Sequence, residues 1–421
     1  MSASVKIIYN KKSFRSWLNT KSWVEKWFIY LILLRPIIDL FYFVKEVSPI
    51  LSPLYFAGVF TPIMAQLSLT AMRDVGKAVK LVDLKILGMM FVIAVAVSSL
   101  TASNIVEFSS LALLTLTPFL LVLYCVKVVR VKEDVTGILY AFALSSITAI
   151  SIMIIEVILN PGSRSLGSNE IEYVRGYYAD PMNYGLYANI LVIAGLKSYY
   201  SRKMKTIVRI YLVVCALVLI ISSHLVSLFA FLSIIAYSLT SKNSNRRNVA
   251  FVLVVLAGLI YSIYTGYYSD QSTDNQMERE LEILRGERPI DQALHGRVSR
   301  WKEYMVLWED KHVLYKMLGV PFSVYVSGLG DASLWMSRAV HSDYLRILYS
   351  VGFVGLIIYL NIVRKVFFSN YKDIDNAVLS RSIFITILLY SVTTLPLLTP
   401  LVSYLFAFGL AVYENEQIVK R

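Results

Sequence analysis

The sequence predicts an all-α, polytopic membrane protein with about twelve transmembrane helices and one large, partly helical periplasmic loop. Three observations lead to this prediction. The 421 residues are 57% hydrophobic and have a mean hydropathy of +0.61, which is too apolar for a soluble domain. Apolar runs of membrane-spanning length, about 20 residues each, follow one another along the chain. Lys and Arg gather in alternate loops, as they do on the cytoplasmic side of membrane proteins.

The first part of the chain, residues 1–23, is basic and polar, and residues 24–265 are expected to hold transmembrane helices 1–9. No small-residue cleavage site follows the first apolar run, so the first span is expected to be an uncleaved anchor. The run 207–240 is too long for one span and breaks at Ser222-Ser223-His224, which predicts a helical hairpin. Single spans are expected near 24–44, 49–71, 84–101, 105–126, 135–159, 183–200 and 249–265.

A long polar interval, 266–342, separates these spans from transmembrane helices 10–12 in residues 343–413. Helix 10 is expected near 343–361. The run 382–413 is again too long for one span and breaks around Pro396 and Pro400, so it predicts a second hairpin. Residues 414–421 form a short tail.

The net charge of +13 is explained by loops rather than by nucleic-acid binding. The N-terminus is basic, and so are the loops near 73–80, 127–132, 202–205, 242–247 and 364–372 and the end at 420–421. The intervening short loops carry almost no basic residues. This alternation predicts that both termini are cytoplasmic and that the loops 160–182 and 266–342 face outward. The two cysteines lie in apolar runs, so neither a disulfide nor a metal site is expected.

The middle of the large loop has helical periodicity. An apolar stripe recurs every three or four positions: Leu294, Val298, Trp301, Met305 and Trp308. At 100° per residue, Arg297, Arg300 and Tyr304 fall together beside this stripe and are expected to form an edge that suits an anionic substrate. The alternative interpretation is an ordinary solvated flank of a packed helix.

The smaller loop 160–182 contains Arg164, Arg175 and the turn Asp180-Pro181. Asp180 is expected to cap the next helix, with Pro181 at its first position. That turn would hold Arg175 at the membrane surface, where its planar fork of donors suits phosphate oxygens. The alternative is an arginine that anchors a span to lipid head groups.

The segment that opens helix 10 contains Arg338 and His341, three residues apart and therefore on one helical face. A histidine at the mouth of a span can act as a base or an acid near neutral pH. A structural role is the alternative. The triplet Asp373-Ile374-Asp375 is interpreted as a chance match in a solvated loop, and no carboxylate or histidine cluster has metal spacing.

In four places the sequence resembles the O-antigen polymerase and O-antigen ligase superfamily, integral-membrane glycosyltransferases that act on undecaprenyl-diphosphate-linked glycans. The four places are Arg175-Gly176 through Asn183; Ser222-Ser223-His224, where many members have Ser-Arg-Gly; Gly296-Arg297 through Trp301 followed by Leu318-Gly319-Val320; and His341-Ser342-Asp343-Tyr344-Leu345 with Gly352 and Gly355. The resemblance implies that Arg175 and Arg297 hold the lipid diphosphate and that His341 is catalytic or orients the acceptor. Arg300 and Arg338 have no family counterpart and stay candidates on their own pattern.

The function expected from these observations is metal-independent polymerisation of lipid-linked oligosaccharide repeat units on the periplasmic face, without a cofactor. Catalytic roles are expected for His341, Arg297 and Arg175, and substrate binding for Arg300, Arg338, Tyr304, Arg164 and Asp180. Expected partners are the undecaprenyl-diphosphate-linked oligosaccharide, membrane lipid and a chain-length regulator protein. The alternatives are a ligase that transfers polysaccharide to lipid A-core, a flippase for lipid-linked oligosaccharide and a scaffold of an export complex.

Overall fold

Helices make up nearly all of the regular structure in the computed structural model. The structure describes residues 11–40, 81–99, 105–159, 164–166, 172–174, 181–196, 201–221, 225–240, 282–283, 285–290, 293–319, 342–393, 397 and 399–418. Within these residues the all-α prediction is confirmed, apart from one two-stranded hairpin. The predicted spans near 49–71 and 249–265 lie outside the described residues.

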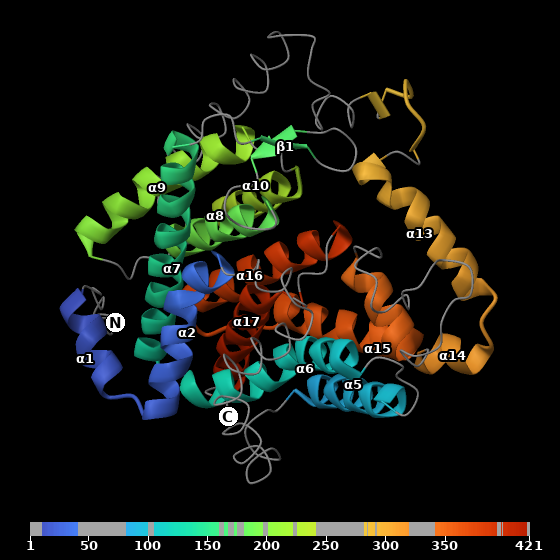
Figure 1. The fold of residues 1–421 in the computed structure, drawn as a ribbon. Helices are drawn as coiled ribbons and strands as arrows, with labels where there is room; N and C mark the ends of the chain where they lie inside the picture. Colours follow the sequence, from blue (N-terminus) through green and yellow to red (C-terminus); the bar gives the residue numbers. More distant parts are fainter. Residues whose placement is uncertain are drawn as a thin grey trace. The chain divides into compact units, whose positions relative to one another are not determined.

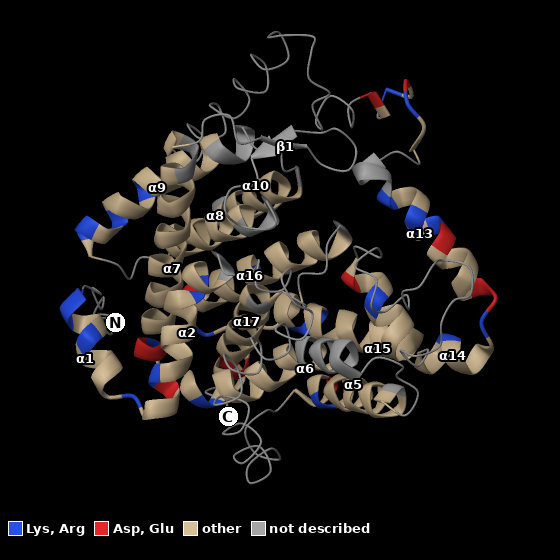
Figure 2. Ribbon diagram, in the orientation of Figure 1, with Lys and Arg blue, Asp and Glu red and all other residues tan. Residues whose placement is uncertain are grey.

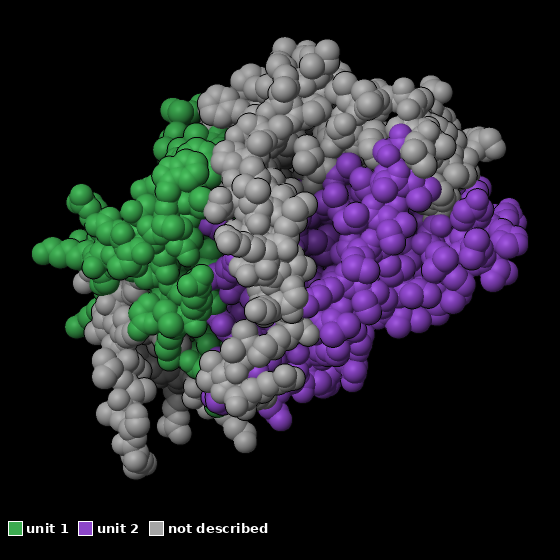
Figure 3. All heavy atoms as spheres, turned by 90° about the horizontal axis from the view of Figure 1, so that it is seen from below, with its two compact units in different colours: residues 1–43, 128–279, 373–386 green, residues 44–127, 280–372, 387–421 purple. Residues whose placement is uncertain are grey.

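The chain divides into two compact units (Figure 3). Unit 1 comprises residues 1–43, 128–279 and 373–386, and unit 2 comprises residues 44–127, 280–372 and 387–421. Each unit gathers segments that are distant in the sequence, so neither can form its core from one continuous stretch of chain.

In unit 1, the helix α7 is the central element (Figure 1). It packs against α1, α2, α8 and α9, and α8 in turn packs against α9 and α10. The elements are α1 (Lys11–Asn19), α2 (Trp23–Leu40), α7 (Lys132–Leu159), β1 (Arg164–Leu166), β2 (Glu172–Val174), α8 (Pro181–Leu196), α9 (Arg202–Ile221) and α10 (Leu225–Thr240). The strands pair antiparallel, with Arg164 opposite Val174.

In unit 2, α15 is the central element and packs against α5 and α14. Its middle is interrupted at Gly352, whose φ of 70° and ψ of −174° are not helical. The elements are α5 (Val82–Ser99), α6 (Ile105–Val128), α13 (Ala293–Glu309), α14 (Val313–Leu318), α15 (Asp343–Phe368) and α17 (Pro400–Ile418). The remaining helix, α16 (Ile374–Thr393), has residues in both units.

Both predicted helix breaks are confirmed. In the run 207–240, α9 ends at Ile221 and α10 begins at Leu225, and in the run 382–413, α16 ends at Thr393 and α17 begins at Pro400. Helix α8 begins at Pro181, as the Asp-Pro turn predicts. Among the described helices, three are long and apolar enough to cross a membrane: Lys132–Ile155 of α7, Asp343–Phe368 of α15 and Ile374–Val392 of α16. The expected count of about twelve is thus not reached by the described helices.

The basic N-terminal region contains an element that the sequence analysis missed. Residues Lys11–Asn19 form the amphipathic helix α1, whose Phe14, Trp17 and Leu18 are buried. The helix packs against α7. Gly137 of α7 makes this approach possible, because a Cβ atom there would lie 2.6 Å from the ring of Trp17. The basic side chains Lys11, Lys12 and Arg15 stay exposed.

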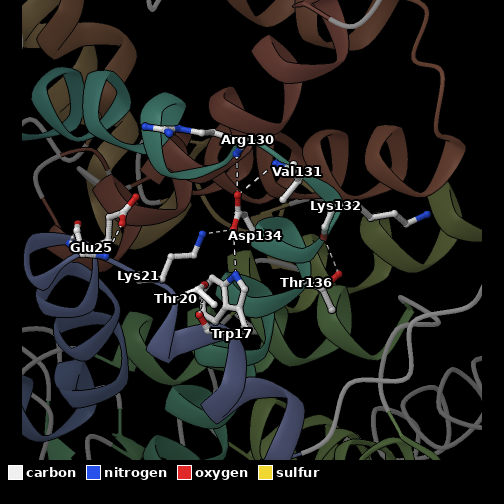
Figure 4. Close-up of polar contacts among 10 residues, drawn as sticks. Trp17, Thr20, Lys21, Glu25, Arg130, Val131, Lys132, Asp134 and Thr136 are labelled. Carbon is white, nitrogen blue, oxygen red and sulfur yellow. Dashed lines mark hydrogen bonds and ion pairs between the residues drawn. The ribbon is translucent and has the colours of Figure 1, made fainter.

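One carboxylate, Asp134 in the first turn of α7, fixes α1 in place (Figure 4). The Trp17 indole N–H donates to Asp134 Oδ1 over 2.9 Å, and the Lys21 ammonium pairs with the same oxygen. Asp134 Oδ2 accepts from the backbone N–H groups of Arg130 at 3.0 Å and Val131 at 3.2 Å. Four donors around one buried carboxylate join the end of α1, the turn after α6 and the start of α7.

We expect Asp134→Ala to release α1. The substitution leaves the Lys21 ammonium, only 13% exposed, without its partner, and hydrogen bonds to charged groups contribute about 1.5–3 kcal/mol each. Trypsin should therefore cut after Arg15 or Lys21 at least about tenfold faster, since each 1.4 kcal/mol is about a factor of ten in the open population. Lys132→Ala is the control, because it removes a more exposed pair with Asp373. Equal cleavage of the two variants would contradict the role of Asp134.

Polar contacts also tie helix ends together in unit 2. Asp83 at the start of α5 binds Asn361 and Lys365 near the end of α15. The N–H of Leu81 donates to Glu414 in α17 over 2.8 Å. All of these residues adjoin segments that the charge pattern assigns to the cytoplasmic side.

Candidate functional site

Three of the predicted site residues lie in α13, and one lies in a strand. The other four lie outside the described residues. Arg297, Arg300 and Tyr304 lie in α13, and Figure 2 shows basic residues in blue along this helix. Arg164 lies in β1, where its backbone alone is described. The predictions for His341, Arg338, Arg175 and Asp180 fall outside the described residues.

Helix α13 packs on α15 through aromatic side chains. Tyr304 and Trp308 are buried together with Leu348 and Tyr349 of α15. The Tyr349 ring meets Trp308 edge-on at a centroid distance of 5.4 Å and Tyr304 at 6.1 Å. The Tyr349 hydroxyl donates to the backbone carbonyl of Tyr304. This cluster fixes the second half of α13 on the first half of α15.

The predicted faces of α13 need correction. Tyr304 is 5% exposed and packs in this cluster, so its expected place on a free basic edge is wrong. Met305, expected in the packed stripe, is 37% exposed. The packed face is therefore rotated toward the basic residues. Arg297 is half-buried and lies two turns before Tyr304 on the same face, whereas Arg300 is exposed.

The short helix α14 is joined to α15 by a close contact between two backbones. Gly319 follows α14 with a φ of 95°, and a Cβ atom there would lie 2.7 Å from the Val351 nitrogen. At Gly352, a Cβ atom would lie 2.5 Å from the Leu318 nitrogen. Both positions therefore need glycine for the approach and for the positive φ.

His312 has a structural role in the same region. It lies at the N-cap of α14, where its Nδ1 accepts from the Leu314 N–H over 3.3 Å. A capping side chain of this kind satisfies one of the open donors at a helix start. This contact supports a capping role for His312 rather than a catalytic one.

The first turn of α15 holds a buried ion pair that the sequence analysis did not select. Asp343 is fully buried, and its Oδ1 accepts from Arg346 Nε at 2.9 Å. Its Oδ2 accepts from the N–H of Leu397, in the segment before α17, at 2.8 Å. The Arg346 guanidinium lies 5.8 Å from the ring centroid of Phe91 in α5. The available signal was the i, i+3 spacing of opposite charges at the start of an apolar run.

Arg346 keeps a donor for which the described residues offer no partner. Its side chain is 5% exposed, and within the described part of the chain its Nη1 has no hydrogen-bond partner. Such a buried, unsatisfied donor costs free energy, typically about 1–3 kcal/mol. Ser342 and Tyr344 lie beside it and donate to the backbone carbonyls of Ser391 and Leu388 in α16. The start of α15 is thus a buried polar centre in an apolar helix bundle.

The strands β1 and β2 organise the smaller loop, where only a turn had been expected. Arg164 pairs with Val174, and Arg175 is the next residue in the sequence. The register therefore places Arg164, a predicted substrate-binding residue, opposite the residue that precedes Arg175, a predicted ligand of the diphosphate. Roles for both side chains stay predictions.

No group of three or more His, Cys, Asp or Glu side chains suited to a metal ion occurs within the described ranges. Comparison with models of known protein families finds no match. No curated protein matches the chain either. The resemblance to O-antigen polymerases and ligases therefore stays an expectation drawn from the motifs themselves.

Proposed function

We propose that the protein is a multi-pass glycosyltransferase of the bacterial inner membrane that polymerises undecaprenyl-diphosphate-linked repeat units on the periplasmic face. The observation that carries the proposal is the packing of the second half of α13 onto the half of α15 that contains the buried pair Asp343 and Arg346. Arg297 lies two turns before Tyr304 on the same face of α13. Ionisable residues inside a membrane-length helix are costly and usually mark a functional site.

The membrane topology in this proposal has about twelve spans and two cytoplasmic termini. Its support is the pairing of helix ends. Asp83 with Lys365 and the Leu81 N–H with Glu414 join segments that the basic loops assign to one side. The Leu397 N–H and Asp343 join segments assigned to the other side. Three described helices of membrane-spanning length support the membrane-spanning part of this topology alone.

The proposed reaction is a glycosyl transfer from one lipid carrier to another. The bond between the anomeric carbon and the diphosphate oxygen of the donor breaks, and the lipid diphosphate leaves with the bonding electrons. A hydroxyl of the acceptor unit forms the new glycosidic bond and gives up its proton. Arg175 and Arg297 would stabilise the departing diphosphate, so that no metal is needed. His341 would accept the proton or orient the hydroxyl.

The test is deletion of the gene followed by gel analysis of surface polysaccharide. Loss of the polymerase should leave core capped with a single repeat unit. Core without polymer, together with accumulated lipid-linked polymer, would indicate a ligase instead. Purified protein supplied with two lipid-linked units should lengthen the glycan; movement of the lipid across the bilayer without a new bond would indicate a flippase.

Within this reaction, we expect Arg297→Ala to abolish polymer at normal protein abundance. Arg297→Lys should restore only part of the activity, because an ammonium cannot reproduce the bidentate fork of a guanidinium. Lys302→Ala is the matched control, since it removes one positive charge from an exposed position of the same helix. Chain-length distribution in the complemented deletion strain is the measurement. Full activity of Arg297→Ala would remove this residue from the site.

A further inference from the structure

We infer that α14 is embedded in the membrane leaflet on the side where α15 begins, with its apolar side chains against lipid acyl chains. The segment from His312 to Gly319 is then a re-entrant element, instead of part of a water-facing loop as its place in the interval 266–342 predicts. The inference rests on the membrane-spanning part of the proposed function and is independent of glycosyl transfer. Three observations carry it.

The first observation is depth along α15. The helix has 26 residues and is interrupted at Gly352, so it spans at most roughly 39 Å at 1.5 Å per residue, whereas the hydrocarbon layer is about 30 Å thick. The excess is thus about 9 Å. Gly352, which contacts the end of α14, lies nine residues after Asp343, or roughly 14 Å. Even if all of this excess helix length projected from the membrane at the Asp343 end, Gly352 would lie within the hydrocarbon layer.

Two features place Gly352 deeper in the hydrocarbon layer than this length alone does. Arg364 and Lys365 lie in the last turns of α15, and charged side chains near a helix end reach toward the membrane surface. They place the membrane boundary at that end of α15 before its last residues. Less of the excess helix length can then project from the membrane at the Asp343 end. A tilt of α15 also shortens its projection on the membrane normal. Each effect moves the contact between α14 and α15 deeper.

The second observation is the surface of α14. It exposes apolar side chains almost all round: Val313 67%, Leu314 57%, Tyr315 39%, Met317 42% and Leu318 55%. No residue of α14 is buried. A helix satisfies its backbone hydrogen bonds internally, so it can enter hydrocarbon where an irregular loop cannot. Five exposed apolar side chains on six residues suit acyl chains and are costly in water.

The third observation is the placement of polar groups at one end of this element. Glu309, Asp310 and Lys311 form the turn before it, and His312 caps it. The Lys316 ammonium reaches back to the carbonyl of Glu309 over 2.6 Å, away from the Gly319 end. Polar groups therefore occupy the level of the head groups, and the helix descends about 9 Å from there to Gly319 at 1.5 Å per residue.

The exposed surface of α14 also continues onto α15. Phe353, which follows the contact residue Gly352, is 50% exposed, and Ile357 and Leu360 follow on the same face at 50% and 45%. In a membrane-spanning helix such a row faces lipid. Lipid is thus the occupant that covers both surfaces without a further assumption.

Spin-label accessibility in lipid nanodiscs that hold one copy of the chain tests the inference. The native Cys125 and Cys215, both buried, are replaced by alanine, and single cysteines at Leu314 and Leu318 are labelled. Leu360→Cys is the lipid reference and the exposed Glu303→Cys the water reference. Oxygen should relax the labels at Leu314 and Leu318 more than a water-soluble nickel chelate does, with Leu318 the deeper site.

The other outcomes each contradict the inference. Labels at Leu314 and Leu318 that match Glu303 would place α14 in water. Labels accessible to neither reagent would mean that another part of this chain covers the helix, because each disc holds one copy. A lipid signal that is absent at Leu360 as well would overturn the membrane-spanning part of the proposed function together with this inference.

Discussion

Asp343→Ala is expected to destabilise the protein by about 3–5 kcal/mol, because it leaves the charge of Arg346 buried without its partner. The substitution also removes the acceptor for the Leu397 N–H, so the segment before α17 loses its link to α15. The expected result is a large drop in the thermal midpoint of the purified protein and low abundance in membranes. Lys365→Ala is the control, since that ion pair is 35% and 18% exposed and should contribute much less.

A double variant separates stability from function at this position. Replacing a buried ion pair by apolar residues of similar volume is often neutral or stabilising by about 1–4 kcal/mol. Asp343→Leu with Arg346→Met should therefore regain most of the thermal midpoint, since only the acceptor of the Leu397 N–H stays missing. If the pair serves the reaction, polymer will stay absent in this folded variant. Normal polymer from the double variant would show that Asp343 and Arg346 act only in folding.

The main elements of the fold were predictable because they depend on local sequence. The long apolar runs with interruptions at Ser222-Ser223-His224 and near Pro396 predict two successive helices each, and the structure has α9 followed by α10 and α16 followed by α17. The start of α8 at Pro181 follows from the fixed φ of proline. Helix α1 could also have been found, because Phe14, Trp17 and Leu18 have helical spacing.

The details of the candidate site depend on contacts between distant segments, and these were not predictable. The packed face of α13 is decided by Tyr349, 45 residues after Tyr304; an ideal helical projection therefore misplaced Tyr304 and Met305. The partner of Asp343 at Leu397 is 54 residues away. The family resemblance drew attention to Gly319 and Gly352, but their mutual contact appears only in three dimensions.

Gly352→Ala is expected to separate α14 from α15. The residue has a φ of 70°, and its new methyl group would meet the backbone of Met317 and Leu318, which cannot move aside as a side chain can. Strained φ values cost about 1–3 kcal/mol for residues other than glycine, and overpacking adds about 1–3 kcal/mol. The total of about 2–6 kcal/mol should appear as a lower thermal midpoint and as loss of polymer.

Two other glycines separate the causes. Gly286 also has a positive φ of 77°, but a Cβ atom there meets nothing within 4 Å, so Gly286→Ala measures strain alone. Gly88 is helical, and its Cβ would make an ordinary contact of 3.7 Å with Phe119. Gly88→Ala should therefore be neutral or stabilising by up to about 1 kcal/mol. A loss in Gly352→Ala no larger than that in Gly286→Ala would argue against the backbone contact.

The partner position supplies the decisive comparison. Gly319→Ala places a methyl group against Ser350 and Val351 and should be as damaging as Gly352→Ala. Both substitutions break one contact, and residues in contact do not contribute independently to stability. The double variant should therefore lose clearly less than the sum of the two single losses, because the second methyl group finds α14 already displaced. Additive losses in thermal unfolding would show that the two glycines act at separate places.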